Sequence, residues 1–122
     1  MTTEIKLKRA YEPESSEDGK RILVDRLWPR GESKVKADLY KWEKQIAPTN
    51  ELRKGLHDGL LSWPDFQAQY LAQLNHNPEA AHFVDEIRDL LKTDNVTLLY
   101  ASKDKDHNNA IVLKEWLGKN LV

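Results

Sequence analysis

The sequence contains no cysteine among its 122 residues. This absence excludes disulfides, iron–sulfur clusters, thiolate zinc sites and cysteine nucleophiles. Histidine-based metal spacing is also missing, because His76, His82 and His107 form no two-histidine pattern, and Asp104 with His107 alone is a weak signal. No glycine-rich nucleotide turn follows an expected strand. We therefore expect neither a metal nor a cofactor.

Strong net charge and long apolar runs are lacking as well. Nineteen Lys and Arg against 20 Asp and Glu leave a net charge of −1, so no overall field attracts nucleic acid or a membrane surface. No apolar run approaches membrane length, and the opening Met-Thr-Thr-Glu does not have the features of a signal peptide. These features predict a soluble cytoplasmic protein without a membrane partner and make nucleic acid an unfavoured one. They do not indicate an oligomeric state.

The residues that are present suit one compact domain. A length of 122 residues is near the commonest domain size, and no internal repeat or low-complexity tract divides the chain. Hydrophobic residues make up 39% of the sequence, with four Trp and four Tyr among the aromatic ones, which favours a folded protein over a disordered one. We expect a single α/β domain over residues 1–122.

Three segments predict the strands of a sheet. Two strands buried on both faces are expected, one at about 21–27 around the apolar run Ile22-Leu23-Val24 and one over the continuous apolar segment 96–101. Residues 5–9 alternate apolar and basic side chains, as a strand with one wet face does, and lysines at alternate positions suit the edge of a sheet. The sheet should therefore have a buried centre and a basic edge.

Helices are expected between and after these strands. Thr49 or Asn50 can cap a short helix over 50–57, and Ser62 and Asn77 precede two longer apolar stripes that start with a proline. A last helix follows the polar loop at 102–109. Strands that alternate with helices predict a three-layer α/β fold, with a small, mainly parallel sheet flanked by helices.

The segment between the first buried strand and residue 50 is harder to assign. Polar, basic residues at 32–36 predict a mobile loop. Leu39, Trp42 and Ile46 stand at helical spacing and predict a short helix over 38–46.

Ligands of open α/β sheets gather beyond the carboxyl ends of the strands. The first buried strand runs into Asp25, Arg26, Trp28 and Arg30, which makes this strand end the natural centre of a site. Asp25 can serve a site or simply pair with a nearby arginine. Arg30, between a proline and a glycine, favours ligand binding, and Arg26 can share that site only if the strand has already ended. Trp28 suits a lid or core aromatic better than a stacking platform.

The second buried strand leads into another candidate segment. Ser102, Lys103, Asp104 and Asn108 lie between this strand and the last helix, a strand–loop–helix arrangement that binds anions in many α/β proteins. Each also has a plainer interpretation, as a helix cap for Ser102 or a solvated ion pair for Lys103 and Asp104. His57 is the best-placed acid–base candidate, or an ordinary surface residue at a helix end.

Residues 23–31, 51–54 and 97–104, together with Phe66, Tyr70, Leu71 and Leu74, resemble the YeaO-like family of bacterial proteins over almost the whole chain. That family has no known function, so the resemblance implies a fold and no activity. A methyltransferase label on some members finds no support here, because the nucleotide turn is missing. The two strand ends are also distantly similar to rhodanese-like domains. That likeness places the cysteine position at Ala101 or Ser102 and implies an anion cradle without its nucleophile.

We therefore expect a site for a small anionic or phosphorylated ligand at the carboxyl ends of the central strands. The ligand-binding candidates are Arg26, Trp28, Arg30, Ser102, Lys103, Asp104 and Asn108, with Asp25 and His57 as catalytic candidates if a hydrolytic or transfer reaction occurs there. The alternative is a non-catalytic module for a nucleic acid or protein partner, with an interleaved basic and aromatic surface of Lys34, Lys36, Lys41, Lys44 and Trp42.

Overall fold

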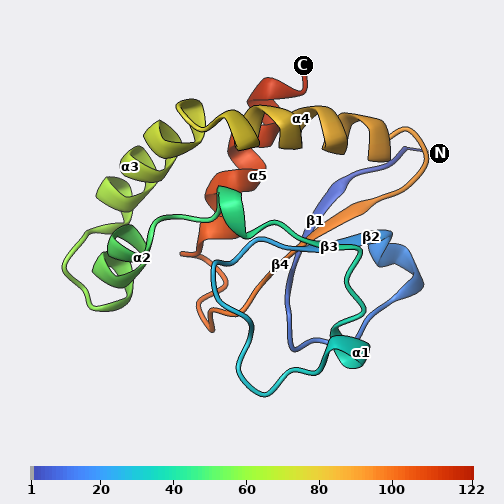
Figure 1. Ribbon diagram of the computed structural model, residues 1–122, viewed down its shortest axis with the longest axis horizontal. Helices are drawn as coiled ribbons and strands as arrows, with labels where there is room; N and C mark the ends of the chain where they lie inside the picture. Colours follow the sequence, from blue (N-terminus) through green and yellow to red (C-terminus); the bar gives the residue numbers. More distant parts are fainter. Residues whose placement is uncertain (1) are drawn as a thin grey trace.

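The computed structural model describes residues 2–122, except for the side chains of Val35 and Lys36. A parallel four-stranded sheet forms its centre, in the order β1-β4-β2-β3 (Figure 1). The strands are β1 (Ile5–Arg9), β2 (Lys20–Leu23), β3 (Lys41–Trp42) and β4 (Val96–Tyr100). The expected parallel α/β fold is thus confirmed.

The two apolar runs occupy the middle of the sheet. All five residues of β4 are buried, and this strand pairs with β1 from Ile5↔Val96 to Arg9↔Tyr100 and with β2 from Lys20↔Val96 to Leu23↔Leu99. The alternating strand β1 lies at an edge, as its lysines predict.

Four helices pack on one face of this sheet: α2 (Asn50–His57), α3 (Trp63–Asn75), α4 (Pro78–Leu90) and α5 (Asn109–Asn120). Each begins where a polar side chain accepts a hydrogen bond from a backbone N–H of the first turn, and the caps are Thr49, Ser62, Asn77 and Asn108. Within the described chain, no helix is long and apolar enough to cross a membrane.

The opposite face of the sheet has a thinner cover, so the two outer layers of the fold are unequal. It consists of the 3-10 helix η1 (Ser16–Asp18), the four-residue α1 (Lys34–Ala37) and the connecting loops (Figure 1). A small apolar cluster of Leu23 and Leu99 lies under this cover, with Trp28 and Trp42 packed against it.

Two expectations between residues 32 and 46 are wrong. The segment 32–36 is not a plain loop, because α1 begins at Lys34. The expected helix over 38–46 is replaced by β3 and the 3-10 helix η2 (Lys44–Ile46). The reason is pairing with β2, since the backbone N–H groups of Tyr40 and Glu43 donate to carbonyls of that strand.

The first buried strand also ends earlier than the expected strand at 21–27. Val24 still donates its N–H to Leu99, but β2 ends at Leu23 and the chain then turns away. Arg26 donates to the carbonyls of Ala47 and Pro48, which follow η2, and takes no part in the ladder. The chain has therefore left the sheet before the candidate site residues begin.

Candidate functional site

Asp25 joins the carboxyl ends of the central strands. Its Oδ2 accepts a 2.9 Å hydrogen bond from the N–H of Ala101, directly after β4, and its carbonyl accepts from Trp42 Nε1 at 2.8 Å. Asn109, at the start of α5, donates from Nδ2 to the carbonyl of Val24 at 3.0 Å, and its side chain lowers the pKa of Asp25. Asp25 therefore holds β2, β3, β4 and α5 together where the sheet ends.

Polar atoms around Asp25 are left without partners. Within residues 2–122, Oδ1 of Asp25 and Nε of Arg53 are buried and make no hydrogen bond. Burial raises the pKa of Asp25, although the Ala101 N–H, the Asn109 side chain and the Arg53 charge oppose the rise. Burial also raises the pKa of Tyr70, and the Asp25 charge adds to that effect. A carboxyl group with a perturbed pKa at a strand end is a recognised mark of functional sites.

Sequence reasoning did not find Arg53. The signal that could have found it is its place in the segment 51–54, which carries part of the family resemblance and lies in α2. The other catalytic candidate, His57, is exposed at the last residue of α2. In the described part of the chain, no hydrogen bond or ion pair joins His57 to Asp25, so the structure does not assemble the two as an acid–base pair.

Arg26 lies at a hollow of about 300 Å³ beside η2 and the junction of α3 with α4. Its Nε donates to the carbonyl of Pro48 at 3.0 Å and its Nη2 to that of Ala47 at 3.1 Å. Nη1 makes no hydrogen bond to the described residues. We call this space the Arg26 hollow, and its lining consists of Arg26, Gln45, Ile46, Ala47, Thr49, Tyr70, Gln73, Leu74, His76, Asn77 and Pro78.

The wall of the Arg26 hollow mixes polar and apolar side chains and carries no carboxylate. Gln73 forms two hydrogen bonds of 3.2 Å with Thr49, one from its amide nitrogen and one to its oxygen. Asn77 donates from Nδ2 to the carbonyl of Gln45 at 3.0 Å. The ring Nδ1 of His76 lies 2.9 Å from a carbonyl oxygen of α3. These contacts fix the side chains around the space.

Trp28 belongs to the apolar cluster on the thinner face. Its ring meets that of Trp42 edge-on, with centroids 5.4 Å apart, and its Nε1 donates to the carbonyl of Glu32 at 2.7 Å. The core interpretation therefore describes its position better than the lid interpretation.

Arg30 and Lys103 lie on neighbouring loops and are exposed. The hydroxyl of Tyr11 donates to the carbonyl of Arg30 at 2.9 Å, and the guanidinium of Arg9 lies 5.1 Å from the centre of the Tyr11 ring. Arg9 in turn donates from Nε to the carbonyl of Ser102 at 2.9 Å. Neither the Arg30 guanidinium nor the Lys103 ammonium group has an ion-pair partner among residues 2–122.

The loop before α5 satisfies its own N–H groups. Asp104 Oδ1 accepts from the N–H of Asp106 at 2.9 Å and from that of His107 at 3.0 Å. These hydrogen bonds, the one from Asp106 foremost, hold the pKa of Asp104 below its usual range. Ser102 accepts from the N–H of Asp104, and Asn108 caps the helix. The expected anion cradle is therefore filled by the chain's own carboxylate.

The basic and aromatic residues of the alternative interpretation are engaged in different contacts. Lys41 forms ion pairs with two glutamates, while Lys44 lies 4.8 Å from the centre of the Trp42 ring. Lys34 is exposed, and the side chain of Lys36 lies outside the described part of the structure.

Comparison with known proteins identifies the family. Residues 4–122 match a family model described as "Inactive DUF488-N3 subclade". The chain belongs to this family. It is 44% identical over 114 residues to the uncharacterized protein YeaO of Escherichia coli (strain K12), an alignment that covers 93% of this chain and 96% of the relative. It is 32% identical over 116 residues to the uncharacterized protein Rv3073c of Mycobacterium tuberculosis (strain ATCC 25618 / H37Rv), with 95% of each chain covered.

The resemblance to the YeaO-like family is thus confirmed. No solved structure matches the chain, and the weaker likeness to rhodanese-like domains finds no support. The curated relatives are themselves uncharacterized, so the DUF488-N3i membership leaves the function to be argued from the site.

The raised pKa of Asp25 predicts a pH-dependent stability. A folded-state pKa above the unfolded value of 3.8 means that the folded protein binds the proton more tightly than the unfolded chain does. The free energy of unfolding therefore falls as pH rises from 3.8 through the folded-state pKa. We expect the Asp25→Asn substitution to remove this fall. Urea unfolding of both proteins between pH 3.5 and about 8 measures it, because all other groups titrate alike in the two. A stability difference that does not change with pH would show that Asp25 has an ordinary pKa.

Proposed function

We propose that the protein binds a small anionic ligand, phosphorylated or carboxylated, in the Arg26 hollow at the carboxyl end of β2. The observation that supports this proposal is the composition of the wall. The hollow contains a guanidinium group, an imidazole and several amides but no carboxylate, in a chain with 20 acidic residues. Small-molecule sites are typically concave and present a few fixed polar groups.

Arg26 is suited to be the main anion contact. Two of its nitrogens are held by the carbonyls of Ala47 and Pro48, so the guanidinium is fixed in place before a ligand arrives. The planar group can present Nη1 to a carboxylate or phosphate oxygen. The imidazole of His76 lies on the same wall, and the N-terminal end of α4, which begins there at Pro78, adds its partial positive charge.

Binding without turnover is the form of the proposal that we favour. The matching family model describes an inactive subclade, and the catalytic candidates Asp25 and His57 are not joined to each other. We assign Asp25 the role of holding the strand ends in place. The alternative nucleic-acid module is not favoured, because net charge is near zero and two of its residues, Lys41 and Lys44, are engaged in separate contacts.

Thermal unfolding against sulfate, phosphate, nucleotides and sugar phosphates tests the proposal. A ligand at one hundred times its dissociation constant should stabilise the fold by about 2.7 kcal/mol, a clear shift of the melting temperature. We expect His76→Gln and Arg26→Gln to reduce the shift. His57→Gln is the matched control, since it replaces an exposed histidine outside the hollow and should leave the shift unchanged.

Arg30→Ala and Lys103→Ala locate the ligand if it binds elsewhere. Both residues lie outside the Arg26 hollow, so the ligand should raise the melting temperature of these variants as much as that of the parent protein. Loss of the shift in these two variants, with no loss in His76→Gln, would move the site to the neighbouring loops and contradict the hollow. No shift with any anion would contradict anion binding itself.

A further inference from the structure

The sequence contains two Asp-Gly steps, Asp18-Gly19 and Asp58-Gly59. When glycine follows an aspartate, its backbone nitrogen can attack the aspartate side chain with little hindrance, because glycine has no Cβ to shield that nitrogen. The product of the attack is a cyclic succinimide. Since both steps have the same chemistry, any difference in their reactivity must come from the folded structure.

The step at Asp58-Gly59 lies in the exposed turn that joins α2 to α3. Asp58 is the C-cap of α2, and its carboxylate has no hydrogen bond or ion pair within residues 2–122. The N–H of Gly59 donates to the carbonyl of Leu56 at 3.2 Å, a long hydrogen bond at a helix end. A Cβ on Gly59 would meet nothing within 4 Å, so this turn can open without disturbing packed residues.

The step at Asp18-Gly19 is held on both sides of the bond that would react. The Asp18 side chain is 3% exposed, and its carboxylate accepts hydrogen bonds from Lys8 and Arg21. A Cβ on Gly19 would lie 2.0 Å from the carbonyl oxygen of Asn95, so the main chain there is packed against backbone atoms. Attack at Asp18 therefore requires the opening of a buried cluster.

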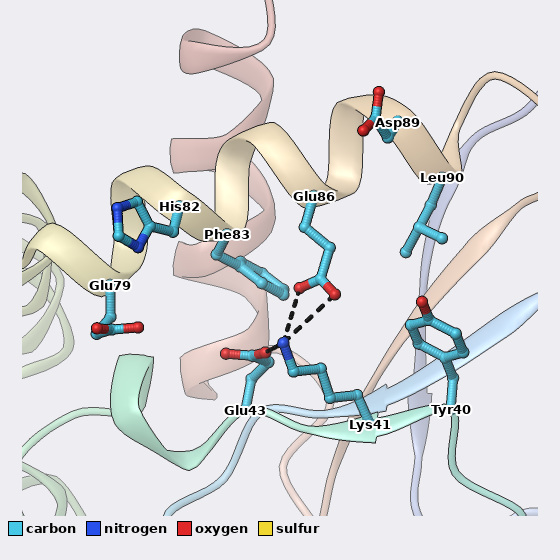
Figure 2. Close-up of a pocket in the computed structure, with 9 residues that line it drawn as sticks. All are labelled: Tyr40, Lys41, Glu43, Glu79, His82, Phe83, Glu86, Asp89 and Leu90. Atoms are coloured by element: carbon cyan, nitrogen blue, oxygen red, sulfur yellow. Dashed lines mark hydrogen bonds and ion pairs between the residues drawn. The ribbon is translucent and has the colours of Figure 1, made fainter.

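A cation also fixes carboxylates elsewhere on the surface. Glu43 and Glu86 share the ammonium group of Lys41 between β3 and α4 (Figure 2). Such contacts hold a side chain in one position and oppose its rotation toward its own main chain. Asp58 has no such contact in the part of the chain that the structure describes. It combines a free carboxyl group with an unshielded neighbouring nitrogen.

We infer that Asp58-Gly59 is a site of spontaneous isomerisation to isoaspartate, which makes the folded protein a substrate for a separate isoaspartyl methyltransferase. The Gly59 nitrogen forms a bond to Cγ of the protonated Asp58 side chain, while the amide proton and one carboxyl oxygen with its proton leave as water. Water then opens the succinimide ring. Opening at Cγ restores aspartate, and opening at the α-carbonyl carbon gives isoaspartate, whose free α-carboxylate can accept a methyl group from S-adenosylmethionine.

Isomerisation would change the end of α2. Isoaspartate at Asp58 adds one methylene to the main chain, directly before the residues that close the helix. The N–H groups of Leu60 and Leu61 both donate to the carbonyl of Gly55, at 2.9 and 3.0 Å. A longer main chain alters this closure, so the modified protein should melt at a lower temperature than the unmodified protein.

Prolonged incubation of the whole folded protein at physiological temperature tests the inference. The probes are methylation by an isoaspartyl methyltransferase with S-adenosylmethionine and peptide mapping by mass spectrometry. We expect isoaspartate at Asp58 to accumulate at least about tenfold faster than at Asp18. In protein unfolded by urea, the two steps should react at similar rates, because the buried cluster around Asp18 is then lost.

Two substitutions should change the rate at this site in opposite directions. Gly59→Ala should slow isomerisation roughly threefold to tenfold, because a Cβ shields the attacking nitrogen. Asp58→Asn should speed ring formation and release ammonia, since ammonia leaves a side-chain amide more readily than water leaves a carboxyl group. Gly118→Ala is the matched control, because Gly118 does not follow an aspartate and a Cβ there also meets nothing within 4 Å.

Three results would overturn the inference. The first is the absence of isoaspartate and of methylation at Asp58 in the folded protein. The second is equal accumulation at Asp58 and Asp18 in the folded protein, which would show that the structure does not distinguish them. The third is a rate in Gly59→Ala equal to that in Gly118→Ala. The outcome does not depend on the Arg26 hollow, so either proposal can fail without the other.

Discussion

Replacing Gly19 by alanine is expected to destabilise the fold by about 3–5 kcal/mol. Gly19 has a φ of +64°, and a Cβ built on it would lie 2.0 Å from the carbonyl oxygen of Asn95 and 2.7 Å from its carbonyl carbon. Both neighbours are backbone atoms that cannot rotate away. The same carbonyl accepts the N–H of Lys20 at 2.9 Å, where β2 begins to pair with β4, so relief of the clash would disturb the centre of the sheet.

Gly59→Ala is the matched control for this prediction. Gly59 also has a positive φ, of +74°, but a Cβ there would meet nothing within 4 Å. The Gly59→Ala substitution should therefore lower the free energy of unfolding only by the backbone strain, about 1 kcal/mol. Urea unfolding of the two variants separates the close contact from the strain. Equal losses of stability would show that the approach of Gly19 to Asn95 is not tight.

The second large effect is expected at Asp18, where Asp18→Ala should cost about 3–5 kcal/mol. Asp18 and Arg21 are each 3% exposed, and Asp18 Oδ2 lies 2.6 Å from Arg21 Nη1. Lys8 contributes a further contact of 2.9 Å to Oδ1. Without the carboxylate, the guanidinium of Arg21 would remain buried without a counter-charge, and its Nη2 already has no hydrogen bond within residues 2–122.

The loss at Asp18 should shrink in acid. Burial raises the pKa of Asp18, but the hydrogen bonds from Lys8, the Ser15 N–H and Arg21 outweigh it and hold the pKa below 3.8. A lowered pKa stabilises the fold above the unfolded value of 3.8, and this contribution is lost as pH falls through the folded value. The difference between parent and variant in urea unfolding should therefore be full near neutral pH and decrease below about pH 4.

Asp85→Asn gives the loss of stability expected for an exposed ion pair, with which the loss in Asp18→Ala is compared. Asp85 pairs with Arg88 at 2.9 Å, but both side chains are well exposed, so the loss should stay below about 1 kcal/mol. If Asp18→Ala costs no more than this exposed pair, the buried cluster does not stabilise the protein as we expect.

Local signals explain why so much of the fold could be predicted. The sequence Ser62-Trp63-Pro64-Asp65 contains a cap, a proline suited to the first turn and an acidic residue, and α3 begins at Trp63. Asn77 plays the same part for α4. The apolar run from Val96 became the central strand because a fully buried strand needs apolar side chains on both faces. Each of these signals lies within a few residues of the element that it specifies.

Signals of the same kind failed where a distant segment decided the outcome. Leu39, Trp42 and Ile46 have helical spacing, but hydrogen bonds to β2 place Lys41 and Trp42 in a strand. The candidate site shows the same limit, since Arg53 reaches the surroundings of Asp25 from helix α2. The spacing of residues around Arg53 or around Asp25 does not indicate that the two lie close together.

The sequence by itself determined the class of the fold, the helix starts, the two central strands and the exclusion of cysteine chemistry, because these follow from nearby residues and composition. Only the tertiary structure decided which polar groups share a site. It separated Arg26 from Arg30, filled the loop before α5 with Asp104, and brought Lys41 between two glutamates from different elements. The physical reason is that charge and hydrogen bonding act through space, so their partners depend on how strands and helices pack.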